Sequence, residues 1–236
     1  MSEDSLGKDQ LAKKGWGIPG ALFLGVSAFL LPNVLLIFLV PGIQQLVLSP
    51  NITNFLYEAL FEALVIMMLY IFVRAYGLRL RDLGLVKFKW RQLGLVALGF
   101  VVYFAVSIAI SSLVQVLVKF DPNQSQDIGF NAPNGAEIIL VFIAIGVLAP
   151  LAEELLFRGF IFRGMRQRLS FWPATLIVSL LFALAHGQIN VGLDVFALSM
   201  VLCWLREKTG SLWPGIILHA SKNMLALILI FVLGIG

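Results

Sequence analysis

The chain has 236 residues, of which 60% are apolar and only 13% charged, with a net charge of +4 and a mean hydropathy of +0.95. A soluble domain is closer to half apolar and a quarter charged, so the apolar excess must face lipid. Soluble enzymes, DNA-binding modules and disordered chains are therefore excluded. The basic residues form short clusters between apolar runs, which is typical of membrane topology and predicts no nucleic-acid partner.

A polar tail, Met1–Gly15, precedes the first apolar run. That run is too long for a signal-peptide core and has no small-residue cleavage pattern, so we expect it to be retained as the first span. Runs long enough for helices follow at Gly20–Val40, Phe55–Val73, Leu93–Val118, Ile138–Phe162, Trp172–His186, Val191–Leu205 and Leu212–Leu233. They predict an all-α, polytopic bundle of about seven transmembrane helices.

Several runs have features of their own. Pro32 should kink the first helix, because proline removes a backbone donor. The fifth and sixth runs are short, at about 15 residues, which suggests helices shielded inside the bundle. We expect residues 1–130 to form an N-terminal membrane region of three helices, and residues 131–236 to form a core of four.

Positive charges fill every alternate link of this arrangement. They are Lys13 and Lys14 before the first span, Arg74 to Arg91 after the second, Arg163 to Arg168 after the fourth, and Arg206 with Lys208 after the sixth. The links Pro41–Asn54, Asp121–Glu137 and Gly187–Asn190 contain no Lys or Arg. The positive-inside rule then places the N-terminus in the cytoplasm and, with seven spans, the C-terminus outside. The amphipathic stretch Leu78–Trp90 is expected along the cytoplasmic surface, and the plasma membrane is the expected location.

Charged residues are concentrated in the fourth run. A charge at mid-span costs about 2.5 to 3.5 kcal/mol on insertion scales, so each one is a candidate for function. Glu154 and Arg158 are four residues apart in the favourable order for a helical ion pair, and we expect that pair to be structural. Glu153 lies about 100 degrees round the helix and has no evident partner there, which makes it the candidate for a chemical role.

The chain has two histidines, both in or at the end of apolar runs. His186 closes the fifth run, and His219 lies in the last run with Asn223 four residues later on the same helical face. A single buried histidine or asparagine is more often a contact between helices than a catalyst. Together with the unpaired Glu153, at compatible depths, the set predicts one polar chamber.

Other polar residues in the runs favour plainer interpretations. Glu58 and Glu62 lie towards the outer end of the second span, where they either line a wet crevice or pair with polar groups of the protein, and we assign them no catalytic role. Asp194 is interpreted as a helix-start charge that favours the helix dipole. Asn190 is either the N-cap of that helix or a site residue.

Three motifs resemble the membrane-embedded CAAX-protease and bacteriocin-processing family, also called CPBP or abortive-infection proteins. Glu-Glu-x-x-x-Arg stands at Glu153, Glu154 and Arg158, Phe-x-x-x-His at Phe182 and His186, and His-x-x-x-Asn at His219 and Asn223. The resemblance covers about Glu137 to Leu233. The chain departs from the family where Ser199 and Cys203 replace glycines that are frequent in the sixth helix, which we expect to affect packing more than chemistry.

The resemblance implies an intramembrane endopeptidase. By that analogy Glu153, assisted by His186, activates water, while His219 and Asn223 hold the oxyanion; Glu154, Arg158, Phe182 and Asn190 are supporting residues. A metal version uses the same atoms, because two histidines and a glutamate with water form the ligand set of several catalytic Zn²⁺ sites. The sequence does not separate the two versions, although the single cysteine excludes a cysteine cage.

The substrate class is open in the same way. Prenylated CAAX-type C-terminal peptides, reached from the cytoplasmic side through the lipid, are one expectation, and bacteriocins or other membrane-associated peptides are another. Two further classes of protein compete with the protease. One is a non-enzymatic immunity or scaffold protein that binds a peptide in the same chamber. The other is an ion-coupled transporter, which the lack of duplicated halves disfavours.

Overall fold

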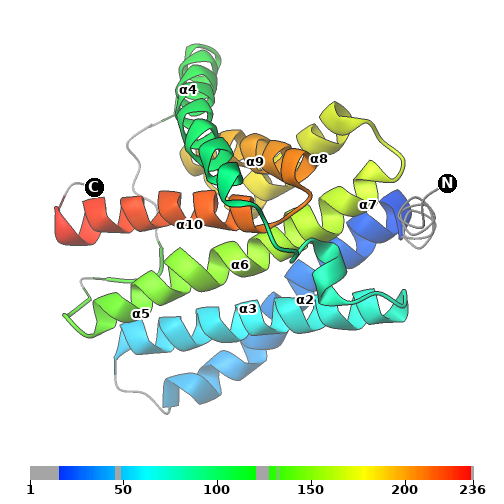
Figure 1. The fold of residues 1–236 in the computed structure, drawn as a ribbon. Helices are drawn as coiled ribbons and strands as arrows, with labels where there is room; N and C mark the ends of the chain where they lie inside the picture. The colour runs from blue at the N-terminus through cyan, green and yellow to red at the C-terminus, as the bar shows by residue number, and fades with distance from the viewer. Residues whose placement is uncertain (1–15, 46–48, 121–127, 132, 235–236) are drawn as a thin grey trace.

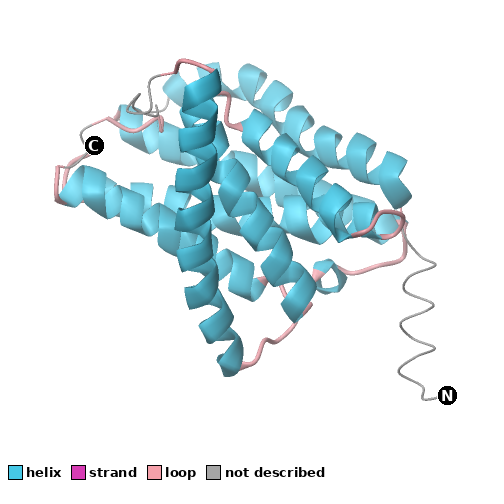
Figure 2. Cartoon of the chain, turned by 90° about the horizontal axis from the view of Figure 1, so that it is seen from above, coloured by secondary structure: helices cyan, strands magenta, loops and turns pink. Residues whose placement is uncertain are grey.

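The structure, a computed structural model, describes residues 16–45, 49–120, 128–131 and 133–234. In these ranges the chain forms helices and loops and contains no strand. Figure 1 shows the helical bundle coloured from the N-terminus to the C-terminus, and Figure 2 shows it from above as helices joined by loops. The all-α polytopic fold is confirmed for the described residues. The polar tail Met1–Gly15 lies outside them.

The first half of the chain contributes three long helices. They are α2 (Gly17–Gln45), α3 (Pro50–Ala75) and α4 (Leu93–Leu117), with short 3₁₀ turns η1 (Leu80–Leu83) and η2 (Trp90–Gln92) between α3 and α4. α2 continues through Pro32 and Pro41, so the predicted link Pro41–Asn54 is shorter than expected. The start of α3 is capped, because the side chain of the N-cap residue Ser49 accepts a hydrogen bond from the Ile52 N–H and Pro50 occupies the first turn.

The fourth run forms one rod whose backbone alternates between α- and π-helix. In order it consists of α5 (Glu137–Ile143), the π-helical η3 (Ala144–Leu148), α6 (Ala149–Glu153), the π-helical η4 (Glu154–Phe162) and α7 (Arg163–Arg166). In Figure 1 this rod lies between α3 and α10, and α4 crosses the others steeply. Such π segments are rare and occur frequently at functional sites.

The last part of the chain forms three helices, of which the third continues into a π-helical turn. They are α8 (Phe171–Ala185), α9 (Ile189–Thr209), α10 (Trp213–Leu227) and the π turn η5 (Ile228–Val232). The fifth predicted run is short as expected, since α8 has 15 residues. The sixth is longer than predicted, since α9 has 21 residues and ends at Gly210, which adopts a left-handed conformation with φ of 68°.

Six helices are long and apolar enough to cross a membrane, and α8 is a shorter apolar helix. α8 lies between α7 and α9 in the chain and packs against α9. Exposed large apolar side chains on the outward faces of α2 and α4, such as Phe23, Phe38, Val101 and Val116, are suited to lipid. The chain is therefore an integral, multi-pass membrane protein, while its orientation and the outside position of the C-terminus stay predictions.

The two ends of the bundle differ in charge and in packing. At the end that carries the basic links, the Leu83 side chain is fully buried, the Leu212 N–H donates to the Gly84 carbonyl, and Arg166 pairs with Glu207. The stretch Leu78–Trp90 thus packs onto this end of the bundle. At the opposite end, the Asn51 and Asn54 side chains on α3 hydrogen-bond to the loop before α5, at the Asn131 and Gly129 carbonyls.

Candidate active site

A cavity of about 460 Å³ opens among α2, α3, the α5–α7 rod, α8, α9 and α10. Glu153, His186, His219 and Asn223 all line it, so the chamber expected from the sequence is present. The lining also includes Glu58, Ile128, Gly129, Ile145, Phe157, Phe182 and Lys222. Because Ile128 and Gly129 belong to the loop before α5, the cavity extends towards the end of the bundle that lacks the basic links.

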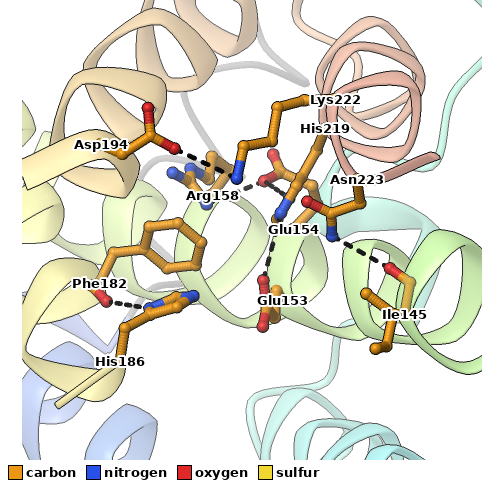
Figure 3. Close-up of polar contacts among 10 residues, drawn as sticks. All are labelled: Ile145, Glu153, Glu154, Arg158, Phe182, His186, Asp194, His219, Lys222 and Asn223. Atoms are coloured by element: carbon orange, nitrogen blue, oxygen red, sulfur yellow. Dashed lines mark hydrogen bonds and ion pairs between the residues drawn. The ribbon is translucent and has the colours of Figure 1, made fainter. Parts of the chain in front are cut away.

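His219 lies between two carboxylates (Figure 3). Its Nε2 is 3.5 Å from the Glu153 Oε2, and its Nδ1 is 3.4 Å from the Glu154 Oε1. The neighbouring glutamates therefore meet opposite edges of one ring. Their exposure differs as well, because 26% of the Glu153 side chain is exposed and 1% of the Glu154 side chain.

The buried carboxylate of Glu154 is paired with an arginine one turn further along the same rod. Arg158 Nη1 donates to Glu154 Oε1 over 2.8 Å, and neither side chain is exposed beyond 1%. This confirms the predicted ion pair. Gly215 on α10 makes room for it, because a Cβ at that position would stand 2.9 Å from the Glu154 Oε2. The contact between Glu154 and His219 was not predicted, since sequence spacing does not show which helices are neighbours.

Asn223 is anchored to a carbonyl that the α5–α7 rod leaves without its usual partner. The Ala149 N–H donates to the Ala144 carbonyl, five residues back. In the same register the Ile145 carbonyl would accept from residue 150, which is proline and has no N–H. Asn223 Nδ2 donates to that carbonyl over 3.0 Å. The carbonyl accepts only, so this contact assigns Nδ2, and its second N–H remains for the cavity.

His186 is oriented by its own helix. Its Nδ1 is 2.8 Å from the Phe182 carbonyl oxygen, which can only accept, so Nδ1 carries a hydrogen and donates. In a neutral ring Nε2 is then an acceptor, and Figure 3 shows the ring pointing towards Glu153. The Phe182 ring packs edge-on against both His186 and His219, and the Arg158 guanidinium lies 4.5 Å from its centroid. The Phe182 ring therefore contacts both histidine rings and helps to fix their positions.

One assignment made from the sequence is wrong. Glu58 lines the same cavity as Glu153, in agreement with the crevice alternative, while Glu62, one turn along, is buried. For Asn190 the N-cap alternative is excluded, because the N-cap is Gln188, and the role of a site residue stays a prediction. The wrong assignment is Asp194, which is not a helix-start charge, since the first turn of α9 contains no acid.

Asp194 instead forms a polar cluster beside the cavity. Its carboxylate is 3.2 Å from Lys222 Nζ and accepts hydrogen bonds from the Tyr103 and Ser107 hydroxyls, at 2.6 and 2.7 Å. Lys222 lines the cavity and lies next to Asn223 in the chain. The sequence carried one usable signal, because Lys222 is the charged residue within an otherwise apolar last run.

The residues proposed as Zn²⁺ ligands do not fit that role in this structure. Across the described ranges, no three His, Cys, Asp or Glu side chains gather closely enough to hold one metal ion. His219 instead directs both nitrogens to carboxylates. The arrangement of Glu153, His186 and His219 therefore suits an acid–base site.

The comparison with known families confirms the resemblance seen in the three motifs. Residues 135–225 match the family model described as type II CAAX prenyl endopeptidase Rce1-like. All three motifs lie in that segment. The segment is thus similar to membrane proteases of the CAAX type.

Three curated relatives are similar to parts of the chain. An uncharacterized 24.3 kDa protein of Escherichia coli is 35% identical over 39% of this chain and 45% of its own length. The uncharacterized protein YyaK of Bacillus subtilis is 32% identical over 58% and 47%, and the "Putative membrane peptidase YdiL" of the same species is 28% identical over 38% and 37%. The chain spans less than half the length of these relatives. No solved structure matches it.

Proposed function

We propose that the protein is an intramembrane endopeptidase that hydrolyses membrane-associated peptides through water activated by Glu153. The observation that carries the proposal is the position of Glu153, partly exposed in a cavity with His219 at 3.5 Å and His186 facing it. The match of residues 135–225 to a protease family supports it. The similarity to CAAX prenyl endopeptidases favours peptides with a prenylated C-terminus as the substrate class.

Peptide hydrolysis needs a base for water, donors for the tetrahedral oxyanion and an acid for the leaving amine. Glu153, with the Nε2 of His186 as a second acceptor, takes a proton from water as the water oxygen attacks the scissile carbonyl. The C–N bond then breaks, and Glu153 returns the proton to the amine nitrogen. Water is thus added across the peptide bond, and no covalent intermediate with the protein forms.

The donors for the oxyanion come from α10. Glu154 Oε1 lies 3.4 Å from the His219 Nδ1, and in the imidazolium form, with a hydrogen on each ring nitrogen, Nε2 can donate to the oxyanion while Nδ1 faces Glu154. The second N–H of Asn223 Nδ2 supplies the other donor, and the Ile145 carbonyl fixes that amide. Donors held before the reaction begins lower its barrier, because they need no reorganisation when charge develops.

The test is hydrolysis by the purified protein reconstituted in lipid. A prenylated CaaX peptide and a mixed peptide library are incubated with wild type and with Glu153→Gln, and the products are read by mass spectrometry. Loss of the base should lower the rate about 10²- to 10⁴-fold. Glu207→Gln, a glutamate paired with Arg166 away from the cavity, is the matched control and should retain the wild-type rate.

The outcomes separate the protease from a binding protein. Cleavage of the prenylated peptide alone would support the CAAX-type substrate, and cleavage of library peptides would widen the class. Peptide binding that survives in Glu153→Gln, with no cleavage by wild type, would contradict the protease and favour an immunity or scaffold role.

A further inference from the structure

A second hollow lies at the end of the bundle that carries the basic links. Two adjoining cavities of about 390 and 530 Å³ share Arg163, Arg206 and Gly210, and we call them together the arginine cavity. Its other charged lining residues are Arg81, Asp82, Arg158, Arg166 and Glu207. Arg158 lines the arginine cavity and also binds Glu154 through Nη1, so this residue connects the arginine cavity with the candidate active site.

Some of these arginines are fully engaged within the protein. Arg166 donates two hydrogen bonds to the Glu207 carboxylate, at 3.0 and 2.7 Å, and a third to the Leu169 carbonyl. Arg81 lies 3.8 Å from Asp82. These pairs account for the two carboxylates that line the arginine cavity.

The other three guanidinium groups have buried nitrogens left over. Arg163 Nη1 and Arg206 Nε are buried without a hydrogen-bond partner among the described residues. Arg158 is fully buried, and its Nε and Nη2 have no partner there beyond the weakly accepting thiol of Cys203. Burial without a partner is costly for a charged group, so the arrangement requires an acceptor that the described chain does not supply.

The charges define what kind of acceptor fits. Five arginines meet three carboxylates, those of Asp82, Glu207 and the Arg158 partner Glu154, which leaves two positive charges uncompensated among the described residues. A phosphomonoester carries a charge of about −1.5 to −2 near neutrality and offers three strong acceptor oxygens. Guanidinium groups bind such oxygens in a bidentate manner.

We propose that the arginine cavity binds a phosphomonoester group, and that in the membrane this group belongs to an anionic phospholipid of the leaflet on the basic side. Arg163 and Arg206 lie at the ends of the spanning segments Glu137–Arg166 and Ile189–Thr209, which is the depth of lipid headgroups. Basic pockets between transmembrane helices on the cytoplasmic side bind such headgroups. The Arg163 guanidinium also stacks 5.2 Å from the Trp16 ring, which orients it at that level.

The test is native mass spectrometry of the purified full chain in phosphatidylcholine nanodiscs with added phosphatidic acid. Wild type should retain phosphatidic acid. Arg163→Gln and Arg206→Gln should each weaken retention about tenfold or more, because each removes charge-assisted hydrogen bonds. Arg168→Gln, which removes an exposed charge outside the arginine cavity, should leave retention unchanged. Arg163→Lys keeps the positive charge but loses the bidentate guanidinium group, so its retention of phosphatidic acid should lie between that of wild type and that of Arg163→Gln.

Two further arms identify the source of the phosphate. Phosphatidylglycerol, whose phosphate is a diester, should bind more weakly than phosphatidic acid. Displacement of phosphatidic acid by inorganic phosphate would support a phosphate site. The proposal would be overturned if phosphate did not affect the retention of phosphatidic acid and if Arg168→Gln weakened that retention as much as Arg206→Gln. A thermal melt of each variant confirms folding, and Arg163→Lys serves where a Gln variant does not fold.

Discussion

Two adjacent carboxylates have separate tasks because their surroundings differ. Glu153 faces the cavity, while Glu154 is buried between Arg158 and His219. Removing one partner of a buried ion pair strands the other charge. Glu154 should therefore act mainly through structure and Glu153 mainly through chemistry.

Glu154→Gln should lower the free energy of unfolding by about 3 to 5 kcal/mol, because it leaves Arg158 as an uncompensated buried charge. Glu153→Gln, which changes a partly exposed group, should lower it by far less. Denaturant unfolding of both variants in detergent micelles checks the difference. The double variant Glu154→Gln with Arg158→Met should recover part of the loss, and equal destabilisation by the two single variants would contradict this division.

Gly215→Ala should reduce peptide hydrolysis while leaving the fold intact, because its Cβ would stand 2.9 Å from the Glu154 Oε2 and push that carboxylate away from His219. Gly94→Ala is the control, since nothing lies within 4 Å of a Cβ there. Hydrolysis rates and melting temperatures of both variants give the comparison. Gly215→Ala with full activity would show that the position of Glu154 does not matter.

At the scale of elements, the π-helical turns explain how α10 is fixed to the α5–α7 rod. The missing N–H of Pro150 frees the Ile145 carbonyl, and Asn223 occupies it. One N–H of the Asn223 Nδ2 thus makes a structural hydrogen bond, and the other is the proposed catalytic donor. The two functions can be separated by a substitution at Pro150 in the α5–α7 rod, which leaves the Asn223 amide in place.

Asn223→Ala should cost about 0.5 to 1.5 kcal/mol of stability, because the partly buried Ile145 carbonyl loses its donor. In a Pro150→Ala background the cost should shrink, since an N–H at position 150 can satisfy that carbonyl. A double-mutant cycle on unfolding free energies measures the coupling, expected at about 0.5 kcal/mol or more. Strictly additive losses would show that Pro150 does not govern the Asn223 contact.

The helices and the identity of the four chamber residues could be predicted from the sequence, since apolar run length and the cost of intramembrane charge are local signals. Contacts between helices could not. The sequence allowed Glu58 to line a crevice, but depth along one helix does not show that this crevice is the Glu153 cavity. The Asp194–Lys222 pair was missed because its partners come from different helices, and the π turns leave no clear pattern beyond Pro150.

At the scale of the whole molecule, the cavity opens towards the end that lacks the basic links. Its lining includes Ile128 and Gly129 from the loop before α5, a link that the positive-inside rule places outside. This disagrees with the expectation that substrates enter from the cytoplasmic side. The division into residues 1–130 and 131–236 stays a prediction, and both regions contribute to the cavity lining.

The orientation can be measured with introduced cysteines, because the native Cys203 is buried and should not react. Ala136→Cys, exposed before α5, should be labelled in intact cells by a membrane-impermeant maleimide. Lys208→Cys, exposed at the basic end, should be labelled only after lysis. The reverse pattern would invert the bundle and restore cytoplasmic access to the cavity.

The layer of side chains between the two hollows has a consequence for the membrane itself. Phe182 lines the candidate active site, Arg158 lines the arginine cavity, and these two fully buried side chains lie 4.5 Å apart. A narrow apolar layer of this kind is a barrier to protons and cations. A hydrolase that admits water deep into a bilayer would otherwise short-circuit the ion gradients that the cell maintains. Because this layer is apolar and its guanidinium is paired with Glu154, the protein can keep a reaction chamber on one side without opening a path for ions.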